Sequence, residues 1–322
     1  MTGRSERQEG SVNRTMKKML FIYNPRSGKG QIRGSLSAII ECFSANDYDV
    51  TIRATQGVKD GERIAEERAG EFDLVVCSGG DGTLDEIVTG MMRSGVRKPI
   101  GYIPAGSTND FANSLGIPKS MEQAAEAAAK GAPFACDLGR FNDDYFVYVA
   151  AFGIFTDVSY QTSQELKNML GHAAYLLEGM KRMGTWKSSH LMVESEEYSA
   201  EGDFVFGMIT NSNSVGGIKG ISGHNVELND GLFEVLLVHT PQNLIEWQET
   251  ITAVLTKDTQ SRRIEMFKTR KMRILSEEPL AWTRDGENGG EHTCVEVENL
   301  QERLDILVEE EPEASQGSIV QI

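Results

Sequence analysis

The sequence FDLVVCSGGDGT at residues 72–83 is an apolar run that leads into a turn with three glycines and one carboxylate, Asp81. The apolar residues after it have the spacing of a buried helix face: Leu84, Ile87, Val88 and Met91. A strand that passes through glycines into a helix predicts a phosphate-binding turn, because glycine lets backbone N–H groups approach an anion and the helix N-terminus favours negative charge. A carboxylate among phosphates needs a cation or a proton in transit, so we expect a Mg²⁺-nucleotide or a hydroxyl substrate beside Asp81.

Two further turns of this kind follow apolar runs elsewhere in the chain. NPRSGKG at 24–30 comes after the run 19–23, and PAGSTNDFA at 104–112 comes after 100–103. The carboxyl ends of parallel strands lie at one edge of a sheet, where open α/β folds bind ligands, so we expect the three turns to meet. The turn at 24–30 is not a Walker A loop, because Tyr23 stands where that loop needs glycine.

Strands and helices alternate from residue 19 to about 136, which is typical of crossover connections. We expect strands at 19–23, 48–54, 72–77 and 99–103, and helices at 32–43, 60–69, 84–92 and 121–130. The sequence therefore predicts an N-terminal, doubly wound, mainly parallel α/β nucleotide-binding domain at 17–137.

After residue 136 the pattern changes to short alternating runs, which predict antiparallel strands. These runs lie at 144–151, 190–197, 204–211, 232–239, 263–267, 271–275, 293–297 and 304–308. Helices are expected at 161–183 and 242–257, with Pro241 at the opening position of the second. We therefore expect a C-terminal antiparallel β-sandwich domain at 138–308.

The two ends of the chain and its overall charge add further expectations. Residues 1–16 are polar and predict a disordered leader, and 309–322 form an acidic tail that could return to the first domain. The formal net charge of −16 argues against nucleic acid as a partner. The four cysteines are scattered, which favours buried thiols in a reducing cytoplasm over disulfides or a metal site. Basic residues gather at 167–187 and 262–273, either as solvated faces or as contacts with an anionic membrane.

Two acidic turns lie in the β-rich part. In WTRDGE at 282–287, Asp285 and Glu287 are two residues apart and would point to one side of an extended chain, so both could act on one ligand. The alternative is an ordinary Asp-Gly turn. In ELNDGL at 227–232 the Asn-Asp-Gly sequence is a hairpin signal, although such turns also suit hard cations.

In combination these motifs resemble the bacterial diacylglycerol kinase family of lipid kinases over nearly all of residues 16–308. The motifs are NPRSGKG at 24–30, GGDGT at 79–83, PAGSTNDFANSLGIP at 104–118, NDGLFEV at 229–235 and RDGE at 284–287. GGDG alone is shared with NAD kinases and sphingosine kinases, whereas the SxNDFA-type block separates this family from both.

The resemblance implies an ATP- and Mg²⁺-dependent transfer of the γ-phosphoryl group to the hydroxyl of diacylglycerol, giving phosphatidic acid. Asp285 would be the general base, with Glu287 beside it and Asp81 in the charge network. Asp230, aided by the carbonyls of Glu227 and Leu232, would hold a structural Mg²⁺. The residues around the nucleotide would be Asn24, Pro25, Arg26, Ser27, Gly28, Thr55, Gly79, Gly80, Asp81, Gly82, Thr83, Leu84, Asp85, Ser107, Asn109 and Asp110.

The chain departs from the family pattern at Asp85 and Thr89, where asparagine is usual. Asp85 adds negative charge near the phosphates, which could raise the dependence on Mg²⁺ or weaken nucleotide affinity. The family also implies a cytoplasmic enzyme with peripheral association at the inner face of the membrane, where the lipid substrate is presented. We expect the β-rich domain and the 161–183 helix to supply the lipid groove, and we leave a homodimer open.

Other functions remain open at this point. The acceptor could be phosphatidylglycerol, a sphingoid base or a polyprenol, because the phosphate-side motifs carry no information on the tail. An NAD kinase would act on a water-soluble acceptor without detergent or vesicles. A non-catalytic protein that binds lipid or nucleotide is a further alternative, although four carboxylates near phosphates have no evident use there: Asp81, Asp110, Asp285 and Glu287.

Overall fold

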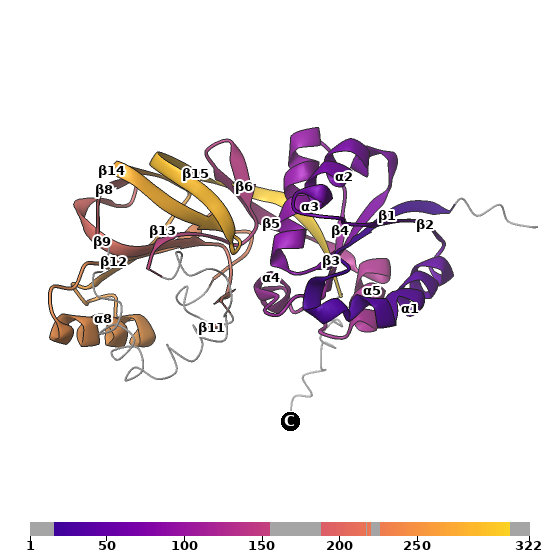
Figure 1. The fold of residues 1–322 in the computed structure, drawn as a ribbon, viewed down its shortest axis with the longest axis horizontal. Helices are drawn as coiled ribbons and strands as arrows, with labels where there is room; N and C mark the ends of the chain where they lie inside the picture. The colour runs from indigo at the N-terminus through magenta and orange to yellow at the C-terminus, as the bar shows by residue number, and fades with distance from the viewer. Residues whose placement is uncertain (1–15, 155–187, 217, 220–225, 310–322) are drawn as a thin grey trace, which may run out of the picture.

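The first lobe is built on parallel strands. The computed structural model describes residues 16–154, 188–216, 218–219 and 226–309. The strands are β1 (Lys17–Tyr23), β2 (Tyr48–Ala54), β3 (Leu74–Gly79) and β4 (Ile100–Pro104), which pair in the order β2-β1-β3-β4. The helices are α1 (Ile32–Ala45), α2 (Asp60–Arg68), α3 (Asp81–Ser94), α4 (Asp110–Ser114) and α5 (Met121–Lys130), with short 3-10 turns at Ser27–Gly30 and Ala69–Glu71. Helices α2 and α3 cover one face of the sheet while α1 and α5 cover the other, so the predicted doubly wound α/β lobe is confirmed (Figure 1).

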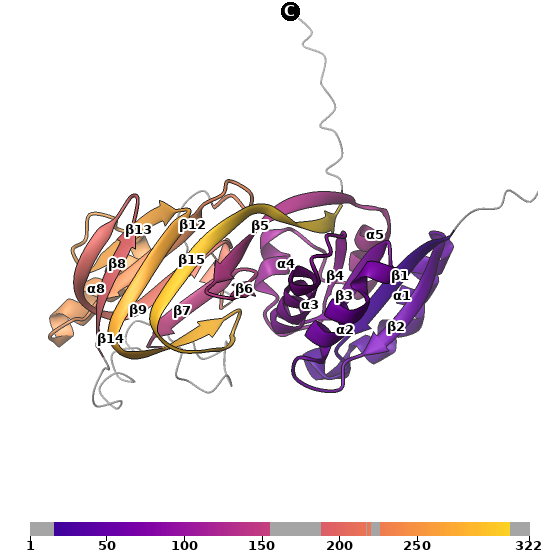
Figure 2. The same cartoon turned by 90° about the horizontal axis from the view of Figure 1, so that it is seen from above.

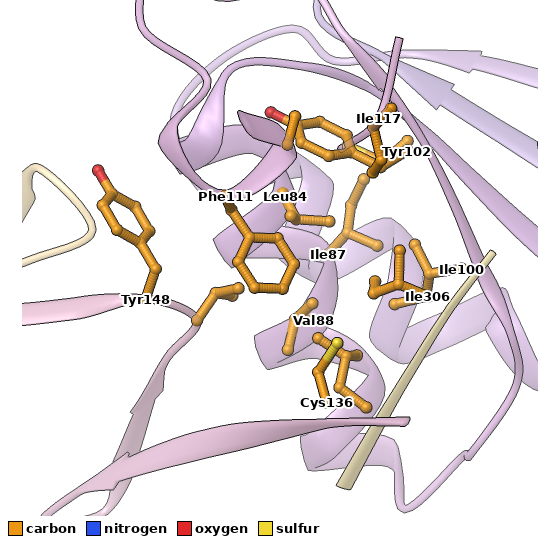
Figure 3. Packing of buried hydrophobic residues seen from close by; sticks show 14 of the residues in the cluster. Leu84, Ile87, Val88, Ile100, Tyr102, Phe111, Ile117, Cys136, Tyr148 and Ile306 are labelled. Carbon is orange, nitrogen blue, oxygen red and sulfur yellow. The ribbon is translucent and has the colours of Figure 1, made fainter. Parts of the chain in front are cut away.

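Helix α3 is fixed between the sheet and the second lobe by its apolar side chains. Leu84, Ile87 and Val88 are buried, as their spacing predicts, and they pack beside Phe111 of α4 and Ile100 of β4 (Figure 3). Gly95 ends the helix in the left-handed conformation, with φ of 70°. The first turn of α3, which carries Asp81, is thereby held at the carboxyl end of β3.

The second lobe is antiparallel. Its strands are β5 (Ala132–Phe141), β6 (Asp144–Phe146), β7 (Val149–Gly153), β8 (Ser189–Ser195), β9 (Ser199–Thr210), β12 (Phe233–His239), β13 (Ile264–Thr269), β14 (Lys271–Arg284) and β15 (Glu287–Val308). A small pair, β10 (Ser214–Val215) and β11 (Ile218–Lys219), and helix α8 (Leu244–Thr256) complete the described part. The order is β13-β12-β9-β7-β14-β15, and β8 pairs with both β9 and β14. A second apolar core lies inside this lobe, around Phe146, Phe152 and Trp282.

Strand β15 joins the two lobes. It pairs with β14 and β5 in the second lobe, and its end pairs in parallel with β4, with Ile306 opposite Ile100 (Figure 2). The expected strands at 293–297 and 304–308 are therefore one long strand, irregular near Glu302, which has a positive φ of 50°. Its last residues, 304–308, pair with β5, and two of them also pair with β4, so the strand at the end of the second domain extends the first lobe's sheet. Parallel pairing with a strand about 200 residues away leaves no local signal.

Other expectations differ from the structure in detail. The expected strand at 144–151 is split into β6 and β7, and strand β5 and helix α4 were not predicted. Helix α8 begins after Asn243, whose side-chain oxygen accepts hydrogen bonds from Ile245 and Glu246, so Pro241 lies before the cap and not at the first helical position. The 161–183 helix, nearly all of the leader and all but the first residue of the tail lie outside the described residues. None of the described helices has the length and apolar character that a membrane span requires.

Candidate active site between the two lobes

The three glycine turns meet at one edge of the parallel sheet. A Cβ atom added to Gly28, which has a φ of +54°, would lie 2.2 Å from the carbonyl oxygen of Ala105. A Cβ atom added to Gly106 would lie 2.6 Å from the Cα atom of Gly80. The turns thus touch through positions where only glycine fits, and the prediction that they share an edge is confirmed.

Side chains of the predicted nucleotide set hold these turns to one another. Asn24 Nδ2 lies 3.4 Å from Thr83 Oγ1, and Asn24 Oδ1 accepts the backbone N–H of Arg26 at 2.9 Å. Asn109 has a positive φ of 53°, and its side chain exchanges two hydrogen bonds with the backbone of Gly106. These amides shape the turns, because their polar atoms are already engaged within the protein.

The rest of the predicted nucleotide set divides by exposure. Arg26 and Ser107 are exposed, whereas Thr55 is buried and its N–H donates to Tyr23. Leu84 is fully buried in the apolar core (Figure 3), so its side chain does not face a ligand. Its predicted place beside the nucleotide therefore needs correction as far as the side chain is concerned. The remaining members lie in the turns themselves, at the end of β3, in the first two turns of α3 or at the start of α4: Pro25, Ser27, Gly79, Gly82, Asp85 and Asp110.

Asp81 links the first turn of α3 to the first turn of α4. Its two carboxylate oxygens accept the backbone N–H groups of Asp110 at 3.0 Å and Phe111 at 3.3 Å. Asp110 is itself buried and accepts a hydrogen bond from the Ser214 hydroxyl of the second lobe. Burial, and next the nearby Asp110 carboxylate, raise the pKa of Asp81 to about 7.

The raised pKa of Asp81 predicts a pH-dependent stability. The folded state holds this proton more tightly than the unfolded state, so stability from this group is present below about pH 4 and is lost as the pH rises to about 7. We expect the thermal midpoint of Asp81→Asn, relative to that of the unmodified protein, to rise between pH 5 and pH 8. Differential scanning calorimetry at several pH values checks this, and a constant difference across the range would contradict it.

Asp285 and Gly286 form the two-residue turn between β14 and β15. Both have positive φ, 48° and 85°, and Arg284 pairs with Glu287 across the turn. This is the twist that suits a tight hairpin. The expectation that Asp285 and Glu287 lie on an extended chain is therefore wrong, because the Asp-Gly pair forms the hairpin turn.

The Asp285 side chain is buried and receives three backbone hydrogen bonds. Its Oδ2 accepts the N–H of Val147, and its Oδ1 accepts those of Tyr148 and Val149, both at 2.9 Å. The N–H groups of Val147 and Tyr148 lie between β6 and β7, and that of Val149 lies at the start of β7. The expected strand at 144–151 is therefore interrupted where the chain directs these N–H groups to Asp285. Burial, and next the charge of Asp285, raise the pKa of Asp85 on α3 well above its ordinary value.

Glu287 reaches across from the start of β15 to the glycine turn of α3. A Cβ atom added to Gly82 would lie 3.0 Å from Glu287 Oε1. Glu287 is exposed as a whole residue. The burial that its carboxyl group does experience raises the pKa of that group. The structure therefore brings the second lobe's two acidic residues to the first two turns of α3, with Glu287 at Gly82 and Asp285 at Asp85.

The predicted Mg²⁺ ligands at 227–232 have other partners. Asp230 Oδ1 accepts the N–H of Leu232 at 3.0 Å, and its Oδ2 lies 3.0 Å from Lys268 Nζ, which also lies 3.0 Å from Glu234. Glu227 is exposed. The described residues contain no cluster of three or more His, Cys, Asp or Glu side chains suited to a metal ion. In this geometry an ammonium group balances Asp230, which does not fit a divalent cation, and no reaction step is assigned to a metal there.

Several residues of the interlobe region were not singled out from the sequence. Arg284 pairs with Asp144 at 2.7 Å and donates to the Tyr145 carbonyl. Asp137 is buried and accepts from the N–H groups of Gly231 and Glu302. The sequence signal that could have identified Arg284 is its position directly before Asp285. For Asp137 the sequence offers only a charged residue next to an apolar run.

A cavity of about 650 Å³ is lined in part by Arg284 and by none of the glycine-turn residues. Its walls include Arg93, Arg140, Asp144 and Glu298. Many of these charges are already paired, as in Arg140 with Glu298 and Arg93 with Asp144. A charged lining of this kind does not suit lipid tails, so we do not assign them to this cavity.

Comparisons with known proteins agree with the two-lobe arrangement. Residues 18–141 match the family described as diacylglycerol kinase catalytic domain, and 149–308 match the one described as YegS C-terminal NAD kinase beta sandwich-like domain. The chain is 33% identical to a diacylglycerol kinase of Bacillus subtilis over 278 residues, which cover 85% of this chain and 91% of that one. It is 30% identical to a diacylglycerol kinase of Staphylococcus aureus over 293 residues, covering 90% and 92%.

Solved structures share the fold. A crystal structure of a diacylglycerol kinase from Bacillus anthracis superposes with a TM-score of 0.72 at 23% identity, covering 91% of this chain and 97% of that one. A second crystal structure from the same strain superposes with a TM-score of 0.75 at 26% identity and the same coverage.

Proposed function

This chain belongs to the diacylglycerol kinase family, and on that premise we propose that it transfers the γ-phosphoryl group of ATP to the hydroxyl of diacylglycerol and so forms phosphatidic acid. The observation that carries the proposal is the contact of Glu287 with Gly82. This contact sets the acidic turn of one lobe against the phosphate-type turns of the other. A nucleotide on the glycine turns would then present its γ-phosphate to the carboxylates of 285 and 287.

The chemistry follows from this arrangement. Backbone N–H groups of the glycine turns bind the phosphate oxygens of the MgATP substrate and stabilise the charge that develops on them. The acceptor hydroxyl oxygen bonds to the γ-phosphorus, the bond from that phosphorus to the bridging oxygen of ADP breaks, and Asp285 takes the hydroxyl proton. Asp81 and Asn109 hold the turns in place through the contacts described above.

A lipid of another class, such as phosphatidylglycerol, a sphingoid base or a polyprenol, would use the same phosphate-side residues. An NAD kinase is the next alternative and a non-catalytic binding protein the last. We also propose that the chain meets its substrate by peripheral association with the membrane, because a diacylglycerol cannot leave the bilayer freely.

The test is a phosphorylation assay with ATP labelled in the γ position. The full chain is incubated with Mg²⁺ and with each candidate lipid in mixed micelles, and with NAD in the absence of detergent. We expect label in phosphatidic acid and none without Mg²⁺. Label in NADP or in another lipid alone would replace the acceptor, and no label in any product would contradict kinase activity.

A further inference from the structure

Arg284, the residue directly before Asp285, has three partners in the second lobe. Its Nη2 lies 2.7 Å from Asp144 Oδ2, and its Nη1 donates to the Tyr145 carbonyl oxygen at 2.7 Å. Its guanidinium carbon lies 5.8 Å from the centre of the Phe141 ring. The side chain is only 16% exposed. A guanidinium that is bound at both arms of its fork and largely buried restricts the backbone that carries it.

The same contacts hold strand β6 just before the segment that binds Asp285. Val147 and Tyr148 donate their N–H groups to Asp285, and they lie between β6 and β7 as members of neither strand. Their position therefore depends on the strands at the two ends of the segment. Strand β7 is paired with β9 and β14, whereas β6 has three residues and among the described strands pairs only with β5. Arg284 supplies side-chain contacts that anchor this short strand to β14.

Asp144 connects these contacts to the first lobe. Its Oδ1 lies 3.3 Å from Nη2 of Arg93, in the last turn of α3, and Arg93 also pairs with Glu62 of α2. Alternating charges thus run from α2 through α3 and β6 to β14: Glu62, Arg93, Asp144 and Arg284. Helix α3 contacts the second lobe at both ends, through Gly82 at its start and Arg93 near its end.

An arginine beside a phosphate site can also bind the nucleotide directly, but the Arg284 guanidinium is already bound. Its charge is balanced by Asp144, and its Nε is buried. We propose that Arg284 and Asp144 are positioning residues, which together with Arg93 hold the Asp285 turn and helix α3 in one arrangement, so that the general base faces the nucleotide turns. The role in turnover rests on the proposed function, whereas the anchoring of residues 147–149 does not.

The anchoring is tested without substrate by hydrogen–deuterium exchange of the backbone N–H groups of 147–149. We expect Arg284→Met to speed this exchange about 10-fold, the change that loss of one hydrogen bond gives. Arg284→Lys should speed it less, because an ammonium group keeps the charge but not the fork. Arg97→Met is the matched control, because Arg97 also pairs through both arms of its fork, with Asp305 of β15. Unchanged exchange in Arg284→Met, or equal acceleration in Arg97→Met, would overturn the proposal, whatever the chain phosphorylates.

The role in turnover is tested by single and double variants in the phosphorylation assay. We expect Arg284→Met and Asp144→Asn each to lower kcat by about 10- to 10²-fold with the KM for ATP within about twofold, because a misplaced base slows the chemical step and leaves nucleotide binding intact. The two residues act through one contact, so the double variant should be about as slow as the slower single variant.

Two kinetic outcomes would overturn the positioning role. A raised KM for ATP with unchanged kcat would place Arg284 on the nucleotide, and losses of kcat that multiply in the double variant would make the two residues independent. If the unmodified protein phosphorylates no lipid, the proposed function fails, and the exchange of 147–149 still decides whether Arg284 anchors that segment.

Discussion

Replacing Asp285 with asparagine is expected to lower kcat by about 10²- to 10⁴-fold, because the amide cannot accept the hydroxyl proton. The effect on stability should be smaller but measurable. The asparagine side chain has one acceptor oxygen in place of two, so at least one N–H among those of Val147, Tyr148 and Val149 loses its partner. An unpaired buried donor costs about 1–3 kcal/mol. Turnover and thermal midpoint measured on one preparation separate the two effects.

A matched control for this variant is Asp143→Asn. Asp143 carries the same carboxylate on the β5–β6 turn, is exposed, and is absent from the glycine turns and from the contacts of Asp285. We expect its kcat and thermal midpoint to match those of the unmodified protein. If Asp285→Asn lowers the thermal midpoint but leaves kcat unchanged, Asp285 holds the hairpin to β7 and another group accepts the proton.

The sequence predicted the first lobe well because each of its signals is local. An apolar run before a glycine turn identifies β3, and the spacing of Leu84, Ile87 and Val88 identifies the buried face of α3. The meeting of the three turns also followed, because parallel strands place their carboxyl ends at one edge. Gly28 and Gly106 then show why glycine is needed, since each leaves no room for a Cβ atom.

The remaining features depend on partners that are distant along the chain. Asp285 is buried because backbone N–H groups of residues 147–149 point at it, and nothing in RDGE indicates those partners, although its Asp-Gly pair is a signal for the turn. Lys268 meets Asp230 only because β13 pairs with β12, which sets Glu234 opposite Lys268. The metal-site prediction rested on oxygen-rich residues alone, and the local sequence does not indicate the ammonium group that pairs with Asp230.

Replacing Gly90 with alanine is expected to be among the most destabilising single changes in the first lobe. Gly90 lies in α3 where the helix crosses α2, and an added Cβ atom would lie 2.1 Å from the carbonyl oxygen of Glu62 and 2.9 Å from the N atom of Glu66. Both are backbone atoms, so α2 must move as a unit. Overpacking of this kind costs about 1–3 kcal/mol or more, which exceeds the gain of about 0.5–1 kcal/mol from alanine in a helix.

Gly34→Ala is the matched control for that variant, because Gly34 is also helical but has no atom within 4 Å of an added Cβ. It should raise the thermal midpoint slightly, since alanine loses less backbone entropy on folding. Gly90→Ala should lower it and should also weaken ATP binding in calorimetric titration, because Asp81 and Asp85 lie on the same helix as Gly90. If the two variants melt together, α2 and α3 are not packed as closely as the structure has them.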